Sequence, residues 1–85
     1  MLETRQLKSL RAAPIPEVGN RVALAVELTG KKQGDVADDL EMSQSQLSDI
    51  CRGRFPDPQL STLRKLAAYF GCQIEDLFPS REAVA

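Results

Sequence analysis

The stretch SQSQLSDICRG, Ser43 to Gly53, combines a strong helix start with a polar first turn. A serine followed three residues later by a glutamine, Ser43 and Gln46, is the pattern of a capping box, which satisfies free backbone N–H groups at the start of a helix. The apolar residues behind them have the spacing of a buried helical stripe and are Leu47, Ile50 and Cys51. The sequence therefore predicts a short helix that is anchored on one side and exposes hydrogen-bonding side chains on its first turn.

Another helix is expected immediately before this one. The segment from about Gln33 to Leu40 places apolar residues on one side, namely Val36, Ala37 and Leu40. Only residues 41–43 connect the two segments, so their apolar faces must pack on each other. Two helices packed across so short a turn form a helix-turn-helix.

The rest of the chain also shows helical rather than alternating apolar spacing. A first helix has its apolar stripe at Val18, Val22, Ala25, Val26 and Thr29. Gly30 is suited to end this helix in a left-handed conformation. A fourth helix, with Asp57 as its cap and Pro58 at its first position, has its stripe at Leu60, Leu63, Leu66, Ala67 and Phe70.

A short fifth helix is expected from about Ile74 to Phe78, and Pro79 stops it. The predicted fold is thus all-α: a compact domain of five helices over residues 18–78, in which the second and third form the helix-turn-helix. Residues 79–85 form a frayed tail.

The first seventeen residues, 1–17, form an N-terminal arm or extension whose structure the sequence leaves open. Their apolar residues are Leu2, Leu7, Leu10 and Ile15, and the segment APIP forces an extended connection before the first core helix. The segment could be a partly ordered tail, a short helix packed on the domain, or part of a dimer contact. Its cations Arg5, Lys8 and Arg11 suit either an arm that embraces DNA or a solvated tail.

Composition limits the class of protein. Eighty-five residues make one domain, and 42% apolar with 27% charged residues is typical of a globular chain. No apolar run is long enough to cross a bilayer, and the N-terminus lacks the apolar segment of a secretory signal. We therefore expect a cytoplasmic protein without a membrane partner.

The sequence gives little support for a metal site, a cofactor or catalytic activity. Cys51 and Cys72 are 21 positions apart and the chain has no histidine, so they cannot make a four-ligand zinc site from thiolates and imidazoles. Both cysteines are interpreted as small buried apolar residues. The absence of histidine also removes the commonest general base. We expect no metal, no cofactor and no enzymatic activity.

The exposed first turn of the anchored helix has side chains that suit the reading of DNA bases. The candidates are Gln44, Ser45, Gln46, Ser48 and Asp49. Glutamine donates and accepts hydrogen bonds in one plane and can pair with N6 and N7 of adenine in the major groove. A helix start also offers backbone N–H groups to phosphate oxygens.

The segment QGDVADDLEMSQSQLSDICRG, Gln33 to Gly53, resembles the helix-turn-helix of the lambda-repressor-like family of phage repressors, Cro proteins and XRE-type regulators. The resemblance extends over the five-helix layout from about Val18 to Phe78. It includes Ala37 at the helix crossing and the segment DPQLSTLRKLAAYFGCQIEDLF.

The resemblance implies that the side chains facing the bases are Gln44, Ser45, Gln46 and Asp49. It implies DNA-backbone contacts from Gln33, Ser43, Arg52 and Arg54, with Ser48, marginal as a base reader, placed in the same group. Gln33 would also brace Gln44 across the turn. Lys32 joins the backbone contacts because of its charge and position.

Three residues depart from the family pattern. Glu41 occupies the turn position that is usually glycine, so either it adopts a left-handed conformation at some cost or the turn differs. Lys31 occupies a position that is usually apolar, which weakens the seal at the end of the first helix. Asp49 could accept a hydrogen bond from cytosine N4 or could repel phosphate.

We therefore expect a sequence-specific regulator of transcription, a repressor, that binds a two-fold-symmetric operator in double-stranded DNA as a homodimer. Candidate dimer contacts are residues 72–78, the end of the fourth helix, and Leu2, Leu7 and Leu10. Two alternatives remain open. One is an antitoxin of this fold that binds a toxin and its own operator. The other is a module that binds a protein partner and has lost DNA reading, favoured by the acidic balance of residues 31–54.

Overall fold

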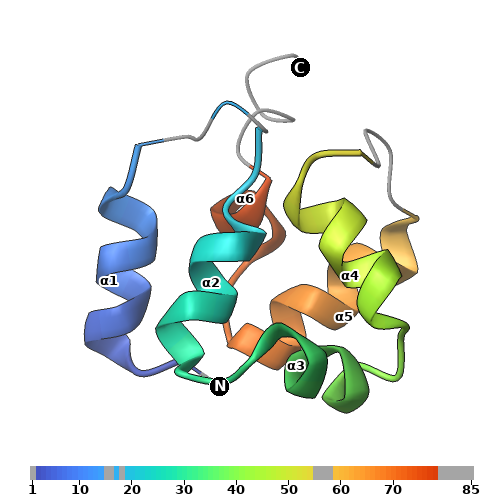
Figure 1. Cartoon of the computed structure of the whole chain (residues 1–85). Helices are drawn as coiled ribbons and strands as arrows, with labels where there is room; N and C mark the ends of the chain where they lie inside the picture. Colours follow the sequence, from blue (N-terminus) through green and yellow to red (C-terminus); the bar gives the residue numbers. More distant parts are fainter. Residues whose placement is uncertain (1, 15–16, 18, 55–58, 79–85) are drawn as a thin grey trace.

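The computed structural model describes residues 2–14, 17, 19–54 and 59–78. Over these ranges the chain is all-helical, with no strand, and its six helices are α1 (Thr4–Ala12), α2 (Val22–Thr29), α3 (Gln33–Asp39), α4 (Gln44–Cys51), α5 (Leu60–Phe70) and α6 (Ile74–Leu77) (Figure 1). The five predicted helices correspond to α2–α6, so the all-α prediction is confirmed, and α1 is an additional helix. The predicted cap Asp57 and Pro58 lie outside the described residues, and α5 begins at Leu60 with Gln59 at its N-cap position.

The helix-turn-helix consists of α3 and α4, joined by a tight turn. Glu41 has a φ of 56° in this turn, so of the two alternatives for this position the structure shows the left-handed conformation. The Met42 N–H donates to the Ala37 carbonyl at 3.0 Å and closes the end of α3. Because the turn is so short, the apolar sides of α3 and α4 face each other.

One apolar cluster holds the helices together. α4 contributes Leu47 and Ile50, which meet residues from α2, α3 and α5 in the buried interior. The largest of the completely buried side chains are Phe70, Leu10, Leu47, Ile50, Leu66, Leu77, Val22 and Val36. Since they come from every helix, each helix depends on its neighbours for burial of its apolar side.

The N-terminal helix α1 belongs to this core. Leu10 is completely buried, the Gln6 side chain donates from Nε2 to the Leu28 carbonyl at 2.6 Å, and the Leu2 N–H donates to the Phe70 carbonyl at 3.0 Å. Among the alternatives for this segment, the structure shows a helix packed on the domain. In Figure 1, α1 lies beside α2, and α2 and α6 lie between α1 and α4. Arg5, Lys8 and Arg11 accordingly lie on a helix.

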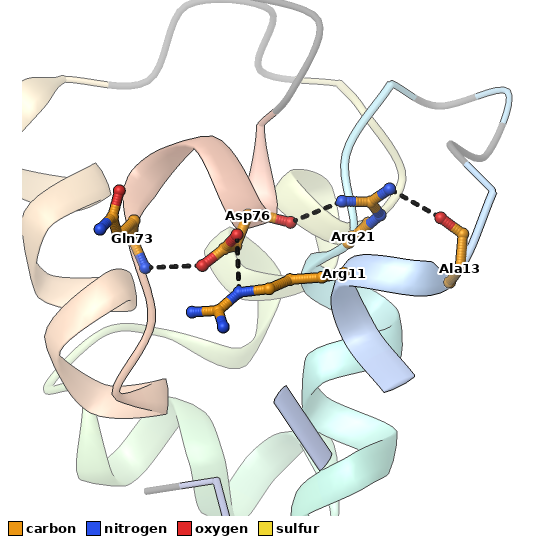
Figure 2. A network of polar contacts seen from close by, with 5 residues as sticks. All are labelled: Arg11, Ala13, Arg21, Gln73 and Asp76. Atoms are coloured by element: carbon orange, nitrogen blue, oxygen red, sulfur yellow. Dashed lines mark hydrogen bonds and ion pairs between the residues drawn. The ribbon is translucent and has the colours of Figure 1, made fainter. Parts of the chain in front are cut away.

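A polar network ties α1 and the start of α2 to α6 (Figure 2). The Arg11 Nε lies 3.1 Å from the Asp76 carboxylate, which also accepts from the Gln73 N–H at 3.0 Å. Buried Arg21 donates from Nη2 to the Ala13 carbonyl at 2.6 Å and from Nη1 to the Asp76 carbonyl at 3.3 Å. These bonds fix the chain on both sides of the segment that follows α1.

Lys31 joins a second polar cluster at the end of α2. Its Nζ lies 2.9 Å from the Asp39 carboxylate and 6.0 Å from the centre of the Tyr69 ring, while the Tyr69 hydroxyl donates to Asp39 at 2.6 Å. The Tyr69 hydroxyl and the Lys31 ammonium lower the pKa of Asp39, and the bond to Asp39 raises the pKa of Lys31. A polar contact that links the α2–α3 connection to α3 and α5 thus takes the place of the usual apolar residue.

Several predicted dimer contacts lie in the interior of the single chain. The residues concerned are Leu2, Leu10, Leu77 and Phe78, all of which are buried by packing between helices. These side chains are already removed from water within one copy, so they have almost no exposed apolar area to offer a partner. The prediction of a dimer contact at these four positions is wrong.

The turn generates a prediction for stability. The substitution Glu41→Gly removes the strain of an L-residue in the left-handed conformation, which is roughly 1–2 kcal/mol. Part of this gain is lost because glycine loses more conformational entropy on folding. We expect the free energy of unfolding, measured by urea denaturation, to rise by about 0.5–1 kcal/mol. The matched variant Glu41→Ala keeps its Cβ and should show no such gain. Equal stabilisation by both variants would contradict the strain at this turn.

Candidate nucleic-acid interface

The first turn of α4 is built as a capped and anchored platform. Ser43 occupies the N-cap position, and its hydroxyl accepts from the Gln46 N–H at 3.0 Å, so the serine half of the predicted capping box is present. Leu47, Ile50 and Cys51 are buried on the inner side. Gln44, Ser45 and Gln46 are exposed, and their side chains make no hydrogen bond to other residues of the described chain. These donors and acceptors are available to a partner.

Gln44 reaches back across the turn towards α3. A Cβ placed on Gly34 would lie 3.3 Å from Oε1 of Gln44, so the Gln44 amide lies over the first turn of α3. The predicted brace from Gln33 to Gln44 has no hydrogen bond in the described part of the chain. Gln33 instead interacts with the Cys51 thiol, opposing the rise in the pKa of Cys51 that burial causes. The residue of α3 beside which the Gln44 amide lies is therefore Gly34.

The predicted base reader Asp49 and the predicted phosphate contact Arg54 lie beside each other. Arg54 Nη1 is 3.7 Å from the Asp49 carboxylate, and the Arg54 N–H donates to the Asp49 carbonyl at 2.8 Å. The Asp49 side chain is 33% exposed and the Arg54 side chain 66% exposed, so both still reach solvent. The negative charge of Asp49 is thereby partly compensated at the end of α4.

The remaining backbone candidates surround the polar turn in the sequence. Lys32 occupies the N-cap position of α3 and Arg52 the C-cap position of α4. Both side chains are exposed, and neither forms an ion pair within the described ranges. Ser48 is half-buried on α4. The cations therefore lie at the start of α3 and at the end of α4.

Asn20 is an important residue that the sequence predictions missed. It is buried, its Oδ1 accepts from the Val22 N–H at 3.0 Å, and its Nδ2 donates to the Ile50 carbonyl at 3.0 Å. An asparagine before a helix is a common capping residue, which could have indicated the first bond. The second bond joins residues 30 positions apart and fixes the end of α4 to the start of α2. No local signal indicates it.

A family model described as a Cro/C1-type HTH DNA-binding domain matches residues 27–79, more than half of the chain. The chain belongs to this Cro/C1-type family. The matched range contains the end of α2 and all of α3–α6, whereas α1 precedes it. Comparisons with curated proteins and with solved structures give no match.

The family match confirms the lambda-repressor-like resemblance and the DNA-binding character of the domain. Cro/C1-type domains are typically non-enzymatic DNA-binding modules. Across the described ranges, no helix of this Cro/C1-type chain has both the length and the apolar character needed to span a bilayer.

The cap of α4 generates the second prediction. Ser43→Ala removes the side-chain acceptor of the Gln46 N–H and should lower the free energy of unfolding by about 1 kcal/mol. Urea denaturation monitored by circular dichroism measures this change. Ser45→Ala, on the same turn but without a hydrogen-bonding partner in the described chain, should change stability by less than about 0.5 kcal/mol. An effect of the same size in both variants would show that the cap does not hold the helix start.

Proposed function

We propose that this chain is a sequence-specific transcriptional regulator, a repressor, that reads the major groove of double-stranded DNA with helix 44–51. The observation that carries the proposal is the exposed turn of Gln44, Ser45 and Gln46 at the start of a buried, capped α4. This turn belongs to the part of the chain that matches the DNA-binding family. Repression would follow when the bound protein occupies an operator that overlaps a promoter in the cytoplasm.

The chemistry of the turn favours reading of bases over general attraction to DNA. The major groove admits an α-helix, and a glutamine amide can form two hydrogen bonds to adenine there. Ser45 is short enough to reach several base edges. Since the net charge of the chain is -1, bulk electrostatic attraction is weak. Sequence-dependent contacts must then supply much of the preference for one site.

Phosphate contacts would position the helix in the groove without reading sequence. Lys32 and Arg52 are exposed and suited to this role. Ser43, Ser48 and Gln33 offer polar groups near α4, and Arg54 shares its charge between Asp49 and a phosphate. We propose that Asp49, held by Arg54, accepts from cytosine N4 at the edge of the site.

A homodimer on a two-fold operator is part of the proposal, because one short helix reads few bases. Two copies would place their α4 helices in half-sites roughly 34 Å apart, one turn of DNA. The dimer surface must lie outside the four buried residues excluded above. Leu60, whose side chain is 53% exposed at the start of α5, is a large apolar residue that remains available in the described chain.

The two alternatives now differ in support. The antitoxin alternative depended on extra apolar surface within residues 1–17, and Leu2 and Leu10 do not contribute to such a surface because they are buried in the core. The protein-binding alternative depended on acidic residues, and Asp35 and Asp38 are indeed exposed on α3. It remains the second candidate, and the experiment below distinguishes it from DNA reading.

Selection from a random duplex library at near-physiological salt tests the proposed function. The protein should enrich a two-fold-symmetric motif, and the variant Gln44→Ala/Gln46→Ala should lose it while remaining folded. Lys8→Ala removes a cation from α1, which lies away from α4, and should enrich the same motif as the unchanged protein. If the folded protein enriches no motif, DNA reading fails and a protein partner becomes the better candidate.

The pairing of Asp49 with Arg54 generates a prediction about salt. Asp49→Asn removes a negative charge and frees Arg54 for a phosphate, so binding to a duplex that lacks the selected motif, where no cytosine contact of Asp49 is lost, should tighten, and the slope of log K against log salt should steepen by about 1. Fluorescence anisotropy at several salt concentrations measures the slope. In an Arg54→Gln background the same substitution should leave the slope unchanged. A slope change that persists without Arg54 would contradict this role.

A further inference from the structure

The backbone conformation at residue 34 is one that residues other than glycine can adopt, yet the residue there is Gly34. It is the second residue of α3 and has no positive φ, in contrast to Gly30, whose φ of 76° ends α2 in the left-handed region. Glycine in a helix is less stable than alanine. The absence of a side chain at this helical position therefore matters for the space around it.

The space beside Gly34 is occupied by the end of the Gln44 side chain. A Cβ on Gly34 would lie 3.3 Å from Oε1, 3.6 Å from Cδ and 3.9 Å from Nε2 of Gln44. These three atoms form the amide group, and they are the nearest atoms that such a Cβ would meet. The amide therefore lies beside the glycine with its oxygen nearest, on the first turn of the neighbouring helix.

We propose that Gly34 is a positioning residue for DNA reading: its missing side chain leaves the space that fixes the Gln44 amide against α3. This inference rests on the proposed function, in which that amide reads adenine. A bidentate pair with adenine needs the donor and the acceptor of the amide in one plane, within about 0.5 Å of the right place. Glutamine is flexible in solution, and a surface that holds its amide lowers the cost of ordering it on binding.

The inference predicts that Gly34→Ala has opposite effects on the stability of the protein and on its recognition of DNA bases. In Gly34→Ala, alanine favours the helix, so the free protein should melt about 2–4 °C higher. The new methyl group displaces the amide by a few tenths of an ångström, so the preference for the base pair read by Gln44 should fall about three- to tenfold. If Gly34 had a merely structural role, Gly34→Ala would stabilise the protein without weakening its recognition of this base pair.

The first measurement needs no DNA. In the free protein, NMR should show a nuclear Overhauser effect between the Gly34 Hα protons and the side-chain amide protons of Gln44. The Gln44 signals are identified by their loss in Gln44→Ala. Absence of this effect overturns the inference, whatever the protein does with DNA.

The second measurement is a double-mutant cycle on duplexes from the library selection. The base pair read by Gln44 is the one at which Gln44→Ala loses its preference. Gly34→Ala should weaken the preference at that base pair alone, and should have no further effect when combined with Gln44→Ala. An unchanged preference in Gly34→Ala, or an effect that persists without Gln44, overturns the inference. If the unchanged protein prefers no sequence while the Overhauser effect is present, the proposed function has failed, and the role of Gly34 in reading falls with it although the contact stands.

Discussion

The packing of α3 on α4 across the four-residue connection 40–43 is the constraint on which the site depends. Burial of Leu47 and Ile50 fixes the rotation of α4, because turning the helix would expose both to water. With that side committed to the core, the first turn must present Gln44, Ser45 and Gln46 outwards. The Ser43 cap holds this turn in helical form, and the left-handed Glu41 shows that the turn tolerates strain to keep the two helices close.

The other helices hold α3 and α4 in place through contacts on their buried sides. Asn20 fixes the end of α4 to the start of α2, and the network around Asp76 joins α6 to the N-terminal segment. α1 completes the core on the side of α2 that faces away from α4 (Figure 1). Its cations therefore lie away from the proposed DNA-binding surface. α1 stabilises the domain, and α4 with the start of α3 presents the polar groups.

Local signals in the sequence were sufficient for the helix-turn-helix. Helical spacing, the Ser43 cap and the glycine that ends α2 act over a few residues, so they predict these elements directly. Contacts between distant residues were not predictable in this way: Gln6 binds Leu28, Asn20 binds Ile50, and Arg11 pairs with Asp76, 65 positions away. Tertiary packing likewise buries leucines expected on a dimer surface.

Chemical-shift mapping tests the central claim, that α4 and the start of α3 form the DNA-reading surface. The ¹⁵N-labelled protein is titrated with a duplex that it selects and with an unrelated duplex of equal length, at near-physiological salt. The account predicts that the side-chain amides of Gln44 and Gln46 and the backbone amides of residues 33–35 and 43–49 shift with the selected duplex, more than with the unrelated one, while those of α1 stay in place. Shifts centred on α1 or α6, with α4 unchanged, would contradict it.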